Sequence, residues 1–222
     1  MSDLSSNIAN AKIILNKKQE EEDEYNFCYG FIGTNRTGKS SIANVIAEKW
    51  RKDNPDPDYE IVSHDPQDNF IKITDRFIDP EDKDWAVKCC ELKNCLLILD
   101  DVRLINEKNT PVNGLMKLLY FRAKRNVDII HICHNPSLLL NSFAHFTNKY
   151  FIFYTNTQEG SFQKKLPNYS LCVAASSMVN KFVSKNGRGK WPNFPHVIVD
   201  TEKQKLIAMN FIESKKDTRF LK

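Results

Sequence analysis

The stretch Gly33-Thr34-Asn35-Arg36-Thr37-Gly38-Lys39-Ser40-Ser41 decides how this chain folds. It matches the pattern G-x-x-x-x-G-K-[ST] at every fixed position, and its two glycines let the backbone wrap closely around phosphate groups. Successive backbone N–H groups in such a loop, and the start of the helix after it, point at the bound anion. Lys39 then reaches the β- and γ-phosphates, and the Ser40 hydroxyl ligates Mg²⁺. We therefore predict that residues 33–41 bind ATP, with Mg²⁺ as cofactor.

The loop pattern requires a strand before it and a helix after it, and the flanking residues predict both. Residues 25–32 form an aromatic and apolar run typical of a buried strand, and residues 39–52 carry apolar side chains at helical spacing. Further along, apolar runs at 59–63, 95–99, 127–133 and 150–154 alternate with segments that favour helices at 68–78, 83–93, 110–124 and 136–146. This alternation predicts an α/β protein, a P-loop NTPase with a mostly parallel central sheet flanked by helices on both faces.

The pattern changes after residue 154. A helix is expected over 169–184, followed by two strands at 196–199 and 206–209 that form a small C-terminal β-hairpin extension. Residues 1–24 are polar and end in an acidic run, so we expect a loosely attached N-terminal arm. Residues 25–222 are expected to form a single P-loop ATPase domain, with a core at 25–155 and a helix and hairpin extension at 156–222.

Composition excludes some classes of protein and leaves others open. The 222 residues carry a formal net charge of +4, which permits a nucleic-acid partner without demanding one. The six cysteines include no CxxC pair, so we interpret them as reduced thiols of a cytosolic protein. No apolar run reaches the ~18 residues that span a bilayer, and the N-terminus lacks the apolar core of a secretory signal. We therefore expect no transmembrane segment.

Acidic residues follow the apolar run Cys95–Leu99, and a hydrophobic strand ending in acid is the second element of a phosphate-transfer site. Asp100 is expected to bind Mg²⁺. Asp101 is expected to polarise the attacking water, although an aspartate is one methylene shorter than a glutamate would be. The alternative is that one of these acids only caps the next loop.

His134 and two arginines are further candidates. His134 follows the apolar run Val127–Cys133, where polar side chains lie at the ligand crevice of a parallel sheet, so we predict that it senses the γ-phosphate. An Asn-Pro turn capped by Asn135 is the simpler interpretation, and the two are compatible. Arg122 and Arg125 end the preceding helix, where cations favour the helix dipole. They are also candidates for an arginine finger that reaches a neighbouring subunit's nucleotide, with Arg103 a weaker candidate.

A basic loop lies between the expected C-terminal helix and the hairpin. It combines glycines at 187 and 189 with Lys185, Arg188, Lys190 and Trp191, and Lys181 flanks it from the helix. Such a loop can track a nucleic-acid phosphate backbone, and it can equally be a solvated charged loop.

The order of these features resembles the FtsK–HerA superfamily of P-loop ATPases. The phosphate loop is followed by a strand ending in acid, an arginine-bearing helix (Phe121-Arg122-Ala123-Lys124-Arg125-Asn126) and a strand ending His131-Ile132-Cys133-His134-Asn135-Pro136. In that superfamily, the short single-domain chain is similar to the genome-packaging ATPases of tailless, membrane-containing double-stranded DNA viruses and phages. The resemblance places the loop, Asp100, Asp101 and His134 at the nucleotide, and Arg122 or Arg125 at the finger position.

The resemblance also implies partners and a place of action. We expect a homo-oligomeric ring, taken to be a hexamer, that uses ATP to translocate double-stranded DNA into a procapsid. Capsid or membrane-vertex proteins are the implied partners, and the host cytoplasm, at the packaging vertex of the virion, is the implied location.

Two alternatives use the same loop differently. A P-loop ATPase of phage assembly or secretion would share these motifs without translocating DNA. A small-molecule or nucleoside kinase would need an acceptor pocket and an arginine-rich lid, whereas the acids after residue 99 and the polar residue after 133 favour hydrolysis. A switch GTPase is disfavoured because no N-K-x-D guanine-reading motif is present.

Overall fold

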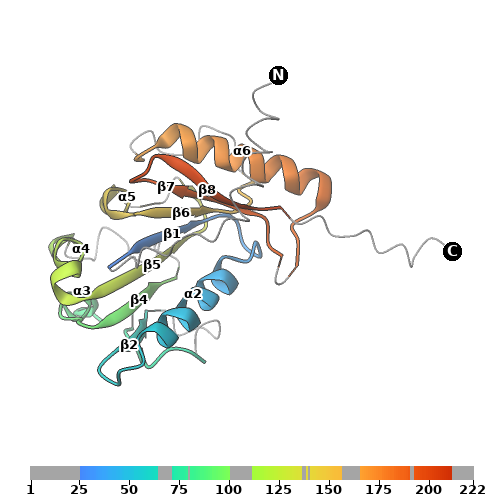
Figure 1. The fold of residues 1–222 in the computed structure, drawn as a ribbon. Coiled ribbons are helices and arrows are strands. Elements are labelled where there is room, and N and C mark those ends of the chain that lie inside the picture. The colour runs from blue at the N-terminus through green and yellow to red at the C-terminus, as the bar shows by residue number, and fades with distance from the viewer. Residues whose placement is uncertain are drawn as a thin grey trace.

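The computed structural model describes residues 26–64, 72–79, 81–100, 112–136, 139, 141–156, 166–190 and 193–211. These residues form one eight-stranded sheet with the strand order β3-β2-β4-β5-β1-β6-β7-β8 (Figure 1). The strands are β1 (Cys28–Ile32), β2 (Glu60–Ser63), β3 (Arg76–Phe77), β4 (Cys95–Leu99), β5 (Val127–Cys133), β6 (Lys149–Ile152), β7 (His196–Asp200) and β8 (Lys205–Asn210).

The sheet is parallel from β3 to β6 and antiparallel beyond it. β1 pairs in parallel with both β5 and β6, and β5 pairs in parallel with β4. β7 pairs antiparallel with β6, and β8 pairs antiparallel with β7. The predicted C-terminal hairpin is therefore confirmed, and it extends the central sheet. The α/β fold class predicted from the sequence is confirmed as well.

Helices cover both faces of the sheet, as predicted from the alternating pattern. On one face α2 (Lys39–Asp53) packs through Ala43, Ala47 and Trp50 against apolar side chains of β1, β4 and β5. On the other face lie α3 (Trp85–Cys90), α4 (Val112–Arg125), α5 (Asn141–Phe146) and α6 (Tyr169–Asn186). None of the helices in the described ranges has both the length and the apolar character that a bilayer crossing requires.

Two helices expected from apolar spacing are wrong in part. Residues 72–78, the described part of the helix expected over 68–78, form a turn and the short edge strand β3. Their backbone bonds to β2 instead of to itself, since Asp75 N–H donates to Ile61 O at 2.9 Å and Ile78 N–H donates to Ser63 O at 2.9 Å. Of the helix expected from 136, Pro136 lies in a 3-10 turn and the α-helix is observed over Asn141–Phe146, so Asn135 does not cap that α-helix.

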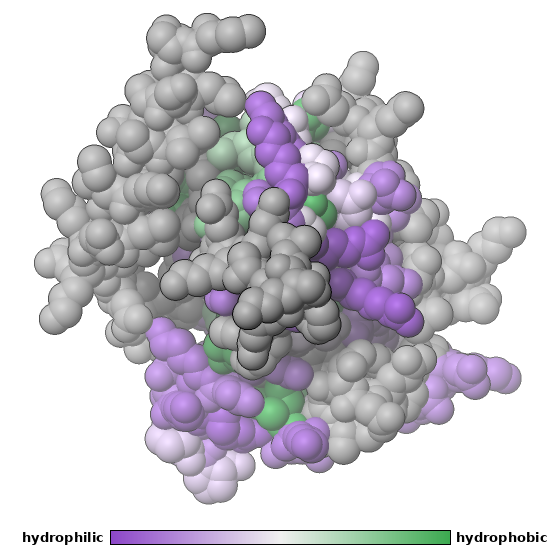
Figure 2. Space-filling view, turned by 90° about the vertical axis from the view of Figure 1, so that its right-hand side faces the viewer, coloured by the Kyte–Doolittle hydropathy of each residue, from purple (hydrophilic) through white to green (hydrophobic). Residues whose placement is uncertain are grey.

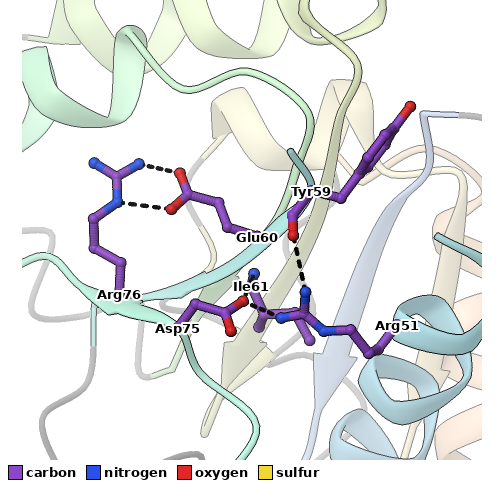
Figure 3. A network of polar contacts seen from close by, with 6 residues as sticks. All are labelled: Arg51, Tyr59, Glu60, Ile61, Asp75 and Arg76. Carbon is purple, nitrogen blue, oxygen red and sulfur yellow. Dashed lines mark hydrogen bonds and ion pairs between the residues drawn. The ribbon is translucent and has the colours of Figure 1, made fainter. Parts of the chain in front are cut away.

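Side chains reinforce this edge of the sheet (Figure 3). The Asp75 carboxylate accepts a hydrogen bond from the Ile61 N–H at 2.6 Å and pairs with Arg51 of α2. Arg51 also donates to Tyr59 O at 2.8 Å, and Arg76 of β3 pairs with Glu60 of β2. Because the carboxylates and cations at this edge form these ion pairs and hydrogen bonds, residues 75–77 are held in an extended conformation. The apolar spacing over 68–78 alone predicts a helix.

A buried histidine gives the fold a pH dependence. The Thr147 hydroxyl donates to Phe143 O at 2.7 Å, so it accepts its other bond, at 2.9 Å, from Nε2–H of His131 on β5. Burial lowers the pKa of His131 from 6.5 to about 3. Below pH 6.5 the unfolded chain therefore binds a proton that the folded chain cannot, and stability falls as the pH decreases. From pH 6.5 to 5 the loss from this group is about 2 kcal/mol.

A comparison with His131→Gln isolates this effect, since burial raises the pKa of Asp128 to about 6 and that carboxyl contributes with the opposite sign. Urea unfolding of both proteins at pH 7.0, 6.0 and 5.0 is the measurement. Between pH 7.0 and pH 5.0 we expect the free energy of unfolding to fall by about 2 kcal/mol more in wild type than in the variant. This difference does not depend on how stable the variant is. Equal pH dependence in the two proteins would contradict a neutral His131.

Candidate nucleotide-binding site

The predicted phosphate loop connects β1 to α2 and is fixed to the strands on both sides of β1. The Gly33 N–H donates to Cys133 O at the end of β5 at 3.1 Å, and the Thr34 N–H donates to Tyr154 O just after β6 at 2.8 Å. The Thr34 hydroxyl also donates to Tyr154 O, at 3.2 Å. The loop is therefore anchored at the carboxyl edge of the parallel strands, where ligands bind in open α/β sheets.

Both fixed glycines of the pattern are required by close packing. A Cβ at Gly33 would lie 2.7 Å from Cβ of Phe153, which follows β6. Gly38 has φ +92°, a left-handed conformation, and a Cβ there would lie 2.1 Å from Cγ of Phe194. The absence of a side chain at Gly33 thus lets the segment after β6 pack against the loop. Its absence at Gly38 does the same for the segment before β7.

The start of α2 is suited to an anion. Gly38 caps the helix without a side-chain hydrogen bond, and the first turn holds no acidic residue, so no carboxylate of the helix competes for its N–H groups. Lys39 is 4% exposed, and its ammonium donates to Thr34 O at 2.8 Å, so it folds back over the loop. Thr37 donates to the same carbonyl at 2.8 Å. These two hydrogen bonds fold the loop back on the Thr34 carbonyl and place the Lys39 ammonium inside the loop.

The predicted magnesium ligands come together although they lie on different elements. Asp100 directly follows β4. Because β5 lies between β4 and β1, those two strands are about 10 Å apart. Even so, the Ser40 hydroxyl on the first turn of α2 donates to Asp100 Oδ2 at 3.4 Å. A hydroxyl and a carboxylate oxygen at the same point are the hard ligands that Mg²⁺ prefers, so the two residues fit the ion. Asp101, the predicted water-activating residue, lies outside the described residues, as does Arg103.

His134 lies at the same edge of the sheet. It directly follows β5, the strand between β1 and β4, so it emerges between the phosphate loop and Asp100. The side chain is half-buried. Its role as a γ-phosphate sensor stays a prediction, and its position agrees with that role.

The two arginines lie at the opposite edge, away from the phosphate loop of their own chain. Arg122 donates to three backbone carbonyls, those of Asn26 at 3.3 Å, Leu119 at 3.1 Å and Phe146 at 3.5 Å. Arg125 is half-buried, and its Nη1, which is itself buried, has no hydrogen-bond partner among the described residues. Arg122 therefore ties α4 to the start of β1, whereas Arg125 is the arginine with unused donor capacity.

Sequence reasoning missed two neighbours of this edge. His64, fully buried, directly follows β2, and its backbone N–H donates to Ile98 O of β4 at 3.2 Å, so it lies near the strand that Asp100 follows. A polar residue directly after an apolar strand was the available signal. The second is the segment before β7, whose Phe194 meets Gly38. No local pattern could have indicated that contact.

The fold and the loop together define a P-loop NTPase. No protein-family model matches the chain, and no curated protein sequence matches it. Among solved structures, the genome packaging NTPase B204 from Sulfolobus turreted icosahedral virus 2, in complex with AMP, matches 83% of this chain and 96% of its own, with a TM-score of 0.56 and 12% identity. The DNA-packaging ATPase B204 from Sulfolobus turreted icosahedral virus matches 81% of this chain and 95% of its own, with a TM-score of 0.54 and 14% identity.

A secretion ATPase has a similar fold. The cytoplasmic domain of the type VII secretion ATPase EccC from Thermomonospora curvata matches 85% of this chain with a TM-score of 0.54 and 12% identity, and the match covers 24% of that longer chain. At these identities the likeness is one of fold. The expected similarity to packaging ATPases is thus confirmed for the fold, over nearly the full length of the viral proteins.

Proposed function

We propose that this protein hydrolyses ATP to drive the translocation of double-stranded DNA, as the packaging motor of a viral or phage genome. The main observation in support of ATP hydrolysis is the hydrogen bond of 3.4 Å from the Ser40 hydroxyl to Asp100 Oδ2, beside the phosphate loop. The DNA-packaging role is supported by the likeness in fold to B204, which extends over 96% of that protein's length.

In the proposed reaction the loop N–H groups and the start of α2 bind the β- and γ-phosphates. Lys39 exchanges the Thr34 carbonyl for phosphate oxygens, which are the stronger acceptors because they are charged. Ser40 and Asp100 would hold Mg²⁺, which would supply positive charge to neutralise the phosphates. Asp101 would polarise the attacking water, and His134, which follows β5, would sense the γ-phosphate.

A second copy of the chain would supply an arginine that stabilises the negative charge on the γ-phosphate in the transition state. The proposed assembly is a ring, taken as a hexamer, in which Arg125 of one subunit reaches the nucleotide of the next. Surface character supports a contact through α4, since Tyr120 is 65% exposed and Phe121 is 43% exposed directly before the arginine-bearing end of that helix. We further propose that capsid or membrane-vertex proteins hold the ring and that it acts in the host cytoplasm.

A second candidate function is favoured by the likeness to EccC, namely an ATPase of secretion or assembly that moves protein instead of DNA. A kinase is the third possibility. We expect double-stranded DNA to raise the rate of phosphate release from ATP, and a nucleoside acceptor to leave that rate unchanged. Transfer of labelled γ-phosphate to the nucleoside would show a kinase instead, and phosphate release indifferent to DNA would favour the secretion role.

A further inference from the structure

The loop between α6 and β7 lies against the phosphate loop. In Figure 1 it descends beside the start of α2, and Phe194 packs directly on Gly38, where a Cβ would lie 2.1 Å from the ring. The Phe194 carbonyl is held in turn by His196 Nδ1 at 2.8 Å and by Asn210 Nδ2 at 3.2 Å. Phe194 is thus anchored on β7 and β8 through its carbonyl and packs on the phosphate loop through its ring.

The fold of the loop itself is specified by glycines and a short bridge. Gly187 and Gly189 have φ values of +82° and +73°, and Lys190 forms an antiparallel bridge with Asn193. A Cβ at Gly189 would lie 2.2 Å from Asn193 O, so the turn closes tightly only with glycine there. This tight turn presents Arg188 toward the phosphate loop.

Arg188 makes two weak contacts with uncharged groups, one with the phosphate loop and one with Tyr154, which follows β6. Its Nη1 donates to Asn35 O at 3.5 Å, the upper limit of a hydrogen bond, and its guanidinium lies over the Tyr154 ring at 4.9 Å. The side chain is exposed, and neither partner carries a charge. A guanidinium bound this loosely can exchange its carbonyl partner for phosphate oxygens, which are charged and can accept two parallel N–H bonds from its planar fork.

We propose that Arg188 binds the phosphate tail of a nucleotide held by the phosphate loop of the same subunit. The arginine finger described above acts between subunits, whereas this arginine acts within one, and it rests on the proposed nucleotide-binding function. Bound nucleotide then holds residues 187–190 against the phosphate loop through Arg188. Figure 2 views this side of the molecule, where most of the described residues in view are hydrophilic.

Lys190 provides a matched control for Arg188. It is exposed and basic, it lies on the same loop two positions away, and no contact joins it to the phosphate loop among the described residues. A long-range effect of loop charge would be equal for the two residues, whereas a direct phosphate contact belongs to Arg188 alone. Both side chains are exposed, so neither substitution is expected to unfold the protein.

The experiment measures equilibrium affinity for Mg·ATP by calorimetry in wild type, Arg188→Gln, Arg188→Lys, Lys190→Gln and Lys39→Ala. We expect Arg188→Gln to raise the Kd about 10-fold and Lys190→Gln to change it less than about 2-fold. Arg188→Lys should fall between, since it keeps the charge and loses the planar fork. Equal shifts in the two glutamine variants, or none in Arg188→Gln, would overturn the proposal.

Inorganic tripolyphosphate serves as a second probe, because it has the phosphates without a nucleoside. The Arg188→Gln defect should persist with tripolyphosphate, and a defect confined to ATP would overturn a phosphate contact.

Trypsin cleavage after Arg188 gives an independent readout, since Mg·ATP should slow it in wild type and not in Lys39→Ala. If wild type bound no nucleotide, the proposed function would fail. If wild type bound it and Lys39→Ala did not, while Arg188→Gln matched Lys190→Gln, only the proposal about Arg188 would fail.

Discussion

Replacing Lys39 with alanine is expected to lower ATP turnover by a factor of about 10³ or more, to the limit of detection. The ammonium is buried at the phosphate loop and bonded to Thr34 O at 2.8 Å, and it is the cation that the loop itself brings to the phosphates. Without it, the charge that develops on the γ-phosphate in the transition state loses its nearest compensation inside the loop.

Lys52→Ala is the control for this change. Lys52 is an exposed lysine in the last turn of the same helix, so its loss removes an equal charge far from the loop. Phosphate release in saturating Mg·ATP should be near the wild-type rate for Lys52→Ala. Turnover by Lys39→Ala at the wild-type rate would show that the nucleotide site has been assigned to the wrong residues.

The second large effect is expected at Arg125, and Arg122 should differ from it. In the assembled ring, Arg125→Ala should lose about 10³-fold in turnover and keep its affinity for ATP, as expected for a finger that acts on a neighbour's nucleotide. Arg122→Ala should mainly lose stability, about 2 kcal/mol, because its guanidinium holds the carbonyls of Asn26, Leu119 and Phe146. Turnover and urea unfolding of both variants separate the two roles.

Mixed rings test whether the finger acts between subunits. An Arg125→Ala subunit has an intact phosphate loop, and a Lys39→Ala subunit has an intact arginine. Mixing two inactive variants should therefore restore part of the turnover, because some Arg125→Ala sites receive the arginine of a Lys39→Ala neighbour. The idea of a finger in trans fails if mixtures stay inactive, or if both arginine variants keep full turnover in the ring.

The centre of the fold could be predicted from the sequence because its signals are local. The phosphate loop, the helix after it and the runs at 95–99 and 127–133 are each specified by a short motif or a continuous apolar stretch, and the structure has all of them. Sheet order is not local. That β5 lies between β1 and β4 could not be predicted from the chain, although it brings Asp100 and His134 to one edge.

The wrong predictions have a common cause. Apolar spacing over residues 68–78 suits a helix, yet the backbone at 75–78 bonds to β2, and Arg51, 24 positions from Asp75, helps to fix it. Arg188 contacts Asn35 across 153 positions of sequence, so the basic loop could only be interpreted by its composition. The sequence left that loop either on DNA or in solvent, and the structure adds a contact between its exposed arginine and the phosphate loop.

The most direct test of the central claim is the steady-state rate of ATP hydrolysis by wild type, with and without double-stranded DNA, at low and at moderate salt. We expect DNA to raise the rate and the increase to shrink as salt rises, because phosphate contacts release counterions. An equal rate with and without DNA at both salt concentrations would contradict a DNA-translocating motor and leave the nucleotide site to another task.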